Sequence, residues 1–398
     1  TLLRALDDLA ADLGVDSKYV QPWGPGVAKL HLDALGPRDH ARYVLVTAMT
    51  PNAKGVGKTT TAIALGDALR LRGHRAAVTI RQSSAGPTFG AKGGGGGGGA
   101  AHAAPLTRSL LHLSGDMHAV TSAHNLIAAL LDNAWHHDAI DLHKLDVQWN
   151  RVADVNDRFL RHIEVGFKTK RRKTHYELTA ASELMAILAL VDGYDHESVV
   201  ADLRQRVGRI VLALSDSEAV TADDIGAAGA ATALLVDAIQ PNLMQSTCGT
   251  PLLLHAGPFA NIAHGCSSIV ADRIGLAGAE WVITEAGFGA DVGAEKFFDI
   301  KCRESGTYPD SAVLVATVGA IRDQGSWENG LANLGRQIQN VRRFGIPVAV
   351  AINKYPSDTP AEHRAICEHA ITAGAHASLV SDAFATGAPG ASERAEVR

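Results

Sequence analysis

Short apolar runs alternate with stretches of helical periodicity along most of the chain. The runs that predict β-strands cover residues 43–48, 76–80, 210–214, 281–284, 312–318 and 347–352. Helical patterns lie between them, for example at 59–71, 119–133, 180–191 and 223–238. Strands that are separated by helices favour a mostly parallel sheet with helices on both faces. We therefore predict an α/β fold, and we expect ligands at the carboxyl ends of the strands.

The loop after the strand at 43–48 has the features of a phosphate-binding loop. Lys58, Thr59 and Thr60 open the next helix, where free backbone N–H groups and the helix dipole attract anions. In such a loop the lysine, here Lys58, reaches the β- and γ-phosphates, and the hydroxyl residue after it, here Thr59, binds Mg²⁺. The standard motif has a glycine where this chain has Asn52, so an ordinary strand–loop–helix connection is the alternative. The predicted nucleotide-binding residues are Asn52, Ala53, Lys54, Gly55, Val56, Gly57, Lys58, Thr59 and Thr60.

Arg81 follows the strand at 76–80, where its guanidinium is expected to hold an anion through two hydrogen bonds. A surface ion pair is the alternative for this arginine. Seven glycines follow at 93–99. Because ordering glycine costs much conformational entropy, this run is expected to form neither strand nor helix. It is interpreted either as a mobile lid over the phosphates or as a flexible linker.

The loop after the strand at 281–284 combines small residues with carboxylates and aromatic rings. Glu285 and Asp291 are candidates to hold metal-bound water or a substrate ammonium, and solvated carboxylates are the alternative. Phe288, or Phe297, is a candidate to cover a nucleotide base, although each ring is also compatible with core packing. Four histidines lack the spacing of a metal site on one helix face and are interpreted as hydrogen-bonding residues that line a cleft: His118, His124, His255 and His264.

Composition narrows the functional classes. Of 398 residues, 46% are hydrophobic and 20% are charged, which is enough for a buried core. The net charge of −5 includes no basic excess, so nucleic acid is not an expected partner. No apolar stretch is long enough to span a bilayer and the first residues do not resemble a signal peptide, so we expect no membrane partner. The four cysteines are scattered, which fits a reducing, cytoplasmic location.

Several stretches together resemble the formate–tetrahydrofolate ligase family, from Lys29 to about Val397. The most specific ones are residues 257–266 and 284–303, and Pro241-Asn242-Leu243 also matches. The resemblance implies ATP-dependent ligation of formate to tetrahydrofolate through formyl phosphate, which gives 10-formyltetrahydrofolate, ADP and phosphate. It implies a P-loop NTPase-like, mostly parallel sheet in residues 1–320 and a smaller α/β segment on the folate side in residues 321–398. The family continues past the position of Arg398, so this chain is expected to be a C-terminally short member.

The resemblance also implies roles for individual residues. Lys58 and Arg81 are the catalytic residues, and Tyr355 and Phe384 stack on the folate ring. ATP and Mg²⁺ are the cofactors, formate and tetrahydrofolate are the substrates, and a monovalent cation is a further candidate. The expected assembly is a cytoplasmic homotetramer.

The chain departs from the family pattern at positions where the family has charged side chains. Val56, Gln82 and Cys248 replace glutamates, and Gly319 replaces an arginine. Lost acidic groups can each lower metal affinity or activity by about 10- to 100-fold. One alternative is therefore a catalytically weakened relative that binds nucleotide or folate. Another is an ATPase of the partitioning or metal-delivery type, because residues 54–60 resemble the deviant phosphate loop of those proteins.

Overall fold

The computed structural model describes residues 3–37, 40–50, 55–86, 88, 95–142, 145–215 and 218–391. Its body is built on a 12-stranded sheet with the order β1-β2-β14-β15-β4-β16-β3-β17-β18-β19, to which β5 and β6 attach through β14. The first five strands in this order are β1 (Val20–Gly24), β2 (Val27–Leu30), β14 (Asn242–Ser246), β15 (Pro251–Leu254) and β4 (Ala76–Ile80). The remaining ones are β16 (Trp281–Glu285), β3 (Arg42–Ala48), β17 (Ser311–Ala316), β18 (Val348–Asn353) and β19 (Ala377–Ser381). The predicted α/β class is confirmed.

Every neighbouring pair from β15 to β19 is parallel, whereas β14, β2 and β1 are antiparallel to their neighbours. The central strands β3 and β4 are buried almost throughout, as expected for parallel strands that are covered on both faces. Their carboxyl ends therefore meet at one edge of the sheet, where ligands are expected.

Helices cover both faces of the sheet. α2 (Lys58–Leu71) and α8 (Ile269–Gly278) both pack against β4 and β16. Gly66 of α2 faces Val78 and Ile283, and Gly275 of α8 faces the adjacent residues Ala77 and Val282. Because successive side chains of a strand point to opposite faces, α2 and α8 lie on opposite sides of the sheet. α11 (Trp327–Arg342) packs against β17 and β18. α12 (Pro360–Thr372) packs against β18 and β19.

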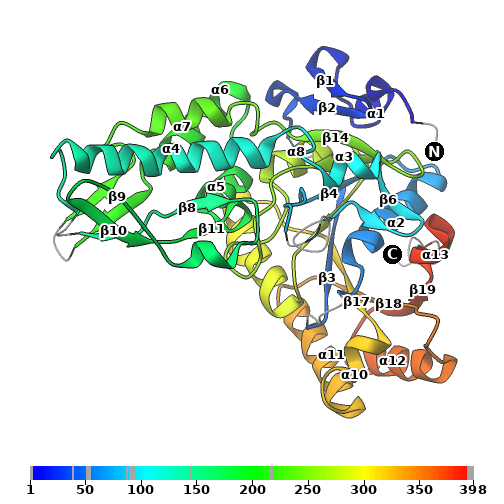
Figure 1. Cartoon of the computed structure of the whole chain (residues 1–398). Coiled ribbons are helices and arrows are strands. Elements are labelled where there is room, and N and C mark those ends of the chain that lie inside the picture. Colours follow the sequence, from blue (N-terminus) through cyan, green and yellow to red (C-terminus); the bar gives the residue numbers. More distant parts are fainter. Residues whose placement is uncertain are drawn as a thin grey trace.

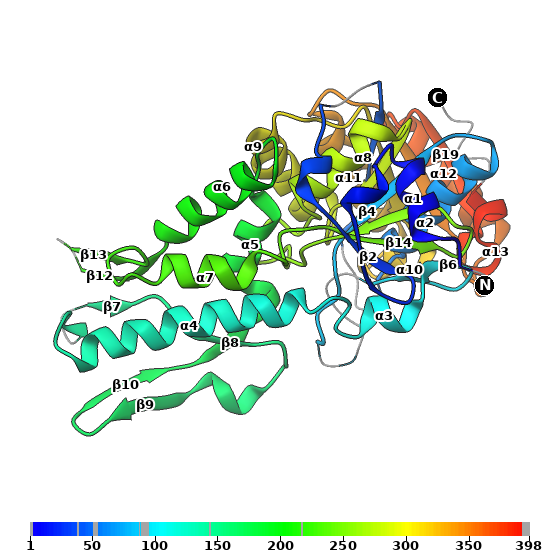
Figure 2. The ribbon, with the colours of Figure 1, turned by 90° about the horizontal axis from the view of Figure 1, so that it is seen from above.

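A lobe projects from this body, on the left of Figures 1 and 2. Its helices are α4 (Asp116–His136), α5 (Glu183–Leu190), α6 (His196–Gly208) and α7 (Ala228–Leu235). Its short strands are β7 (Asp146–Val147), β8 (Arg151–Ala153), β9 (Ile163–Phe167), β10 (Lys170–Thr174), β11 (Tyr176–Leu178), β12 (Val211–Leu214) and β13 (Ala219–Thr221). The lobe has a hydrophobic cluster of its own around Val120, Ile127 and Leu184.

Several predicted elements need correction. The strand predicted at 210–214 forms, but as β12 it pairs antiparallel with β13 and β7 in the lobe and not with the central sheet. The strand predicted at 312–318 ends at Ala316 because Thr317 caps the short helix α10 (Val318–Arg322). The helix predicted from 180 begins at Glu183, where Ser182 caps it. The predicted boundary at residue 320 falls between β17 and β18, which pair with each other in the central sheet, and the division into 1–320 and 321–398 stays a prediction.

The glycine run is partly a strand, contrary to the prediction. Gly97–Gly98 form β5 and pair antiparallel with β6 (Ala101–Ala104). Ala100, next to the run, donates its backbone N–H to the carbonyl oxygen of Phe384 at 2.8 Å. A Cβ on Gly99 would lie 2.0 Å from that oxygen, so only glycine fits against it. Residues 93 and 94 lie outside the described part of the chain, so the lid and linker interpretations of them stay predictions.

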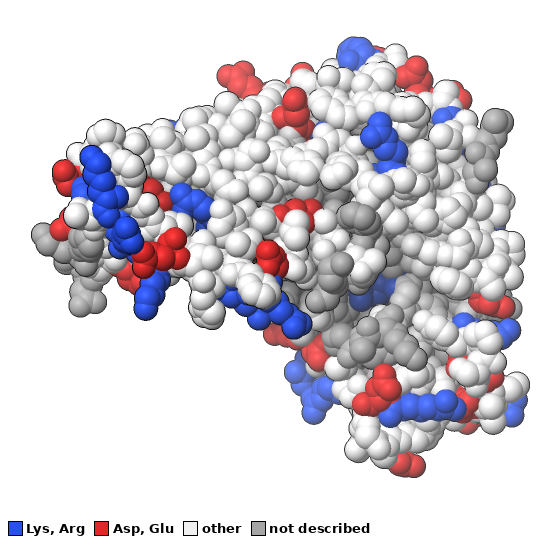
Figure 3. Space-filling view, in the orientation of Figure 1, with Lys and Arg blue, Asp and Glu red and all other residues white. Residues whose placement is uncertain are grey.

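Within the part of the chain that the structure describes, no helix has both the length and the hydropathy needed to cross a membrane. Charges of both signs are spread over the face of the molecule in Figure 3.

Candidate functional site

The predicted phosphate-binding loop is described from Gly55 onward, and its predicted residues Asn52, Ala53 and Lys54 lie outside the described residues. Gly57 precedes α2 with a φ of 83°, in the left-handed region that favours glycine. A Cβ on Gly57 would lie 2.7 Å from the amide nitrogen of Asn353. Asn353 ends β18, and its amide donates to the carbonyl oxygen of Val56 at 2.7 Å. The end of β18 therefore holds the second half of the loop in place.

The first turn of α2 faces a buried carboxylate. Glu285 is the last residue of β16, which lies between β3 and β4 in the sheet. Its Oε2 accepts a hydrogen bond from the Thr59 hydroxyl at 2.7 Å. Lys58 is half-buried, and burial lowers the pKa of its ammonium to about 8; the Glu285 carboxylate opposes this shift and the Arg81 guanidinium adds to it. Glu285 and Arg81 are thus both close enough to Lys58 for their charges to act on its ammonium.

Arg81 is only 7% exposed, immediately after β4. Its NH1 donates to the carbonyl oxygen of Pro258 at 3.0 Å, and its Nε has no partner among the described residues. A Cβ on Gly287 would lie 3.0 Å from its NH2, so the loop after β16 passes directly over the guanidinium. The alternative of a surface ion pair is therefore wrong. The end of β4 that carries Arg81 lies two strands away from β3 and not beside it.

Only one of the four predicted histidines lies near this group. His264 is 2% exposed with an unpartnered Nε2 among the described residues, and burial, with the Lys301, Arg81 and Lys296 cations, lowers its pKa to about 3. Its imidazole is therefore neutral near pH 7. The other three make hydrogen bonds elsewhere: His255 to Ser268 and the Ala238 carbonyl, His124 to the Asn150 carbonyl, and His118 to His112. His124 and His255 are enclosed by the fold, so the prediction that they line a cleft is wrong.

The predicted ring-binding residues are exposed and follow three strands of the sheet. Phe288, Tyr355 and Phe384 are 41%, 44% and 64% exposed. Tyr355 and Phe384 follow the neighbouring parallel strands β18 and β19, and the two loops are joined by an ion pair of 3.3 Å between Lys354 and Asp382. Phe288 has a φ of 58°, an uncommon backbone conformation for an aromatic residue. Phe297 is fully buried against Tyr43 and Phe298, so it is a core residue.

The sequence pattern did not single out Asn353, and it offered Glu285 only as a candidate to hold metal-bound water or a substrate ammonium, without linking it to the phosphate-binding loop. Both are the last residues of strands in the parallel part of the sheet. The position at a strand end was the available signal, but the strand order needed to bring them to Lys58 is not visible in the pattern.

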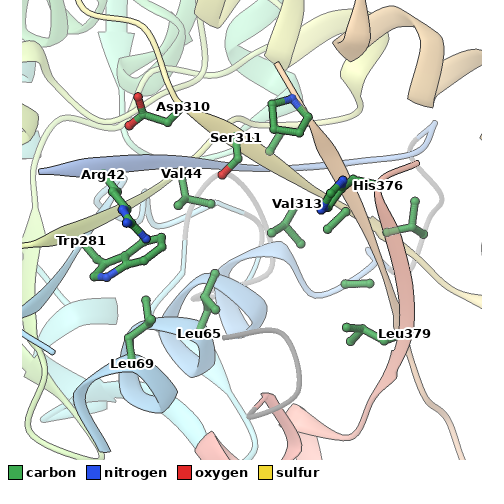
Figure 4. Close-up of a pocket in the computed structure, with 15 residues that line it drawn as sticks. Arg42, Val44, Leu65, Leu69, Trp281, Asp310, Ser311, Val313, His376 and Leu379 are labelled. Carbon is green, nitrogen blue, oxygen red and sulfur yellow. The ribbon is translucent and has the colours of Figure 1, made fainter. Parts of the chain in front are cut away.

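A cavity of about 330 Å³ lies elsewhere, between α2 and the opposite ends of the strands. Figure 4 shows Leu65 and Leu69 of α2 on one side of it and the stacked side chains of Arg42 and Trp281 at one end. Arg42, Trp281 and Ser311 are the first residues of β3, β16 and β17. This cavity is therefore at the amino ends of the strands and does not belong to the candidate site.

Among the described residues, no cluster of three or more His, Cys, Asp or Glu side chains is arranged to hold a metal ion. A divalent ion at Thr59 would therefore depend on fewer protein ligands and on a bound phosphate, as is usual for Mg²⁺.

Comparison with known proteins places the chain in a family context. A family model described as formate–tetrahydrofolate ligase matches residues 1–397. The formate–tetrahydrofolate ligase of Chloroflexus aurantiacus is 48% identical over 98% of this chain and 73% of its own length. That of Saccharopolyspora erythraea is 49% identical over 100% of this chain and 74% of its own length. Formate–tetrahydrofolate ligase 3 of Rubrobacter xylanophilus is 46% identical over 99% of this chain and 73% of its own length.

Proposed function

This chain belongs to the formate–tetrahydrofolate ligase family, and we propose how its residues divide the work of that reaction. The reaction is the ATP-dependent ligation of formate to tetrahydrofolate, which gives 10-formyltetrahydrofolate, ADP and phosphate. Lys58, Thr59, Arg81 and Glu285 form what we call the phosphate side of the site. Tyr355 and Phe384 form the folate side.

On the phosphate side, an oxygen of formate attacks the γ-phosphorus of ATP while the bond to ADP breaks, which gives formyl phosphate. Phosphoryl transfer depends mainly on positioning and on neutralising the charge of the equatorial oxygens. Lys58 supplies one cation at the start of α2, and the buried guanidinium of Arg81 supplies another with its Nε directed to no described partner. The proposal is supported by the geometry at the carboxyl edge of the sheet. The Thr59 hydroxyl in the first turn of α2 donates to the buried Glu285 at the end of β16, and the buried Arg81 guanidinium after the adjacent strand β4 keeps an Nε without a partner among the described residues.

Thr59 is the proposed contact of the Mg²⁺ that accompanies ATP. The ion supplies charge neutralisation for the β- and γ-phosphates. The residues fit such an ion, because the Thr59 hydroxyl oxygen lies 2.7 Å from a buried carboxylate. The chain's own part is to present this hydroxyl in the first turn of α2, beside the helix N–H groups that receive phosphate oxygens.

On the folate side, the rings of Tyr355 and Phe384 stack against the folate ring system and hold its N10 toward the formyl carbon. N10 attacks that carbon, the carbon–oxygen bond to phosphate breaks, and the N10 proton leaves to solvent. The backbone of Phe384 is held in place because its carbonyl oxygen accepts a hydrogen bond from the N–H of Ala100 beside the glycine run. Phe288 is the proposed cover for the nucleotide base.

A spectrophotometric assay tests this function. The protein is incubated with ATP, Mg²⁺, formate and tetrahydrofolate, and the acid-generated methenyl chromophore is followed. Formate-dependent product that is lost in Lys58→Ala supports the proposal. Folate or ADP binding without product would instead favour the weakened relative, and ATP hydrolysis that ignores formate and folate would favour the partitioning-type ATPase.

Two of the four substituted positions, Val56 and Gly319, do not obstruct the proposed loop. The side chain of Val56 is 3% exposed and packs in the hydrophobic core of the body, so it does not fill the loop. A Cβ on Gly319 has no neighbour nearer than 3.9 Å, so the missing arginine leaves open space there. A homotetramer, as inferred from the family resemblance, stays a proposal that sedimentation equilibrium of the purified chain tests directly.

A further inference from the structure

Glu285 carries a buried carboxylate oxygen that the fold does not use. The side chain is 1% exposed, and its Oε2 accepts from the Thr59 hydroxyl. Its Oε1 has no hydrogen-bond partner among the described residues. An ionised carboxylate that is withdrawn from water is costly unless each oxygen is paired with a donor or a cation. Oε1 of Glu285 is therefore expected to gain its partner from a ligand that binds at the site.

The surroundings of Glu285 indicate which partner fits. The end of β16 places it between the strand that leads to Lys58 and the strand that leads to Arg81. Among the described residues, no ion pair within 4.0 Å joins either cation to Glu285, although its charge acts on Lys58. The substrates assigned above are anionic at this end, so none of them offers a donor group to a carboxylate. A metal cation that is bound to the triphosphate can instead pair with this carboxylate.

Thr59 and Glu285 together match the chemistry of a hard divalent ion. Such ions take oxygen ligands, and in phosphate-loop proteins they are held by the hydroxyl after the loop lysine and by a carboxylate from elsewhere in the chain. Here the hydroxyl is that of Thr59, and β16 pairs in parallel with β3 from Trp281 to Glu285. We propose that Glu285 is the carboxylate that binds the divalent cation of the nucleotide, with Thr59 as the second protein ligand. This inference rests on the proposed binding of ATP at Lys58.

Asp291 provides a matched control. It lies in the same loop region as Glu285, and sequence reasoning gave both the same role. Unlike Glu285 it is exposed, and its Oδ2 accepts only a long hydrogen bond of 3.4 Å from Thr50. A carboxylate that already has water around it has no need of a metal, so Asp291 is not expected to hold the ion.

The test measures Mn²⁺ binding in the presence of saturating ADP, by the relaxation of water protons. Glu285→Gln keeps the acceptor oxygen for Thr59 and removes only the charge. We expect it to weaken Mn²⁺ binding by about 10- to 100-fold, while ADP binding without metal changes by less than about threefold. Asp291→Asn is expected to leave both affinities unchanged, and Thr59→Ser is expected to retain Mn²⁺ binding that Thr59→Val loses.

Three results would overturn this inference. Unchanged Mn²⁺ affinity in Glu285→Gln, with normal ADP binding, would remove the role of Glu285 and leave the proposed function intact. An equal loss of Mn²⁺ affinity in Asp291→Asn would show that any negative charge in this loop region affects the ion, and not Glu285 specifically. Failure of the unsubstituted protein to bind ADP at all would remove the proposed function itself. If Glu285→Gln does not fold, Glu285→Asp is measured in its place. An Mn²⁺ affinity of Glu285→Asp between that of the unsubstituted protein and that of Thr59→Val would support the inference.

Discussion

The two sides of the candidate site are built in opposite ways. On the phosphate side, Arg81 and Glu285 are 7% and 1% exposed and are fixed at the ends of central strands. On the folate side, Tyr355 is 44% exposed in the loop after β18, and Phe384 is 64% exposed in the short helix α13 (Ala383–Thr386) after β19, the last strand in the sheet order. Charges act most strongly where water is excluded and where they need no rearrangement during the reaction. A large flat substrate instead needs an open surface on which to stack, so each side suits its own half of the reaction.

The largest expected effect tests the phosphate side. Arg81→Lys keeps a positive charge but loses the planar pair of donors, so we expect product formation to fall by about 10²- to 10³-fold. The KM for tetrahydrofolate should change little, because the folate side is untouched. Steady-state assays with each substrate varied measure both effects. Arg343→Ala, which removes an exposed arginine at the end of α11, serves as the control and should leave the rate unchanged.

The second effect tests the folate side. Phe384→Ala removes a stacking surface worth about 1–3 kcal/mol per ring, so the KM for tetrahydrofolate should rise by about tenfold, with the KM for ATP unchanged. Phe384→Trp should restore it. Phe159→Ala removes a ring in the lobe that is 93% exposed, and it should have no effect on either constant. A rise in the KM for ATP in Phe384→Ala would mean that the two sides are not separate.

The sequence predicted the strands and loop motifs of the two sides better than it predicted their order in the sheet. Continuous apolar runs locate β3, β4, β16 and β18 nearly to the residue, because strands that are buried on both faces have no alternative pattern. The loop lysine and the arginine after β4 were likewise visible as local motifs. The strand order was not visible, because parallel strands pair across long connections. Glu285 bonds to Thr59 across 226 positions and Asn353 to Val56 across 297, and nothing local signals either contact.

The glycine run shows the same limit. Its composition predicts an unordered segment, yet Gly97 and Gly98 pair with β6, and Gly99 lies against the backbone of Phe384. These partners come from elsewhere in the chain, and their hydrogen bonds offset the entropy of ordering glycine. Only the tertiary structure reveals that the run supports the folate side.

A third prediction concerns the buried histidines, one beside the phosphate side and one in the lobe. Burial lowers the pKa of His264 to about 3 and that of His124 to about 4, below the unfolded value of 6.5. Between pH 6.5 and pH 4 the unfolded chain therefore binds protons that the folded chain does not, so the free energy of unfolding should fall as the pH falls. Each histidine contributes about 1.4 kcal/mol per pH unit at most.

Chemical denaturation at several pH values measures this slope. His124→Gln should reduce it, because the lobe then loses one buried base, whereas His137→Gln, at an exposed position after α4, should not. A slope that is the same in both variants would show that His124 does not stay neutral in the folded protein.

The smallest expected effect concerns Phe288, whose φ of 58° is unfavourable for a side chain that carries a ring. Phe288→Gly should raise the free energy of unfolding by about 1 kcal/mol and weaken ADP binding a few-fold through loss of the ring. Phe288→Ala keeps the strained backbone and loses the ring, so it should weaken binding without the gain in stability. Thermal denaturation and ADP titration of the two variants separate the contributions.

The central claim is that the phosphate side joins formate to the γ-phosphate before the folate side takes over the formyl group. Formate labelled with ¹⁸O tests it directly, since the oxygen that attacks phosphorus leaves with the phosphate. The account predicts that the phosphate released during turnover carries one labelled oxygen from formate. Unlabelled phosphate, released while 10-formyltetrahydrofolate is formed, would contradict it.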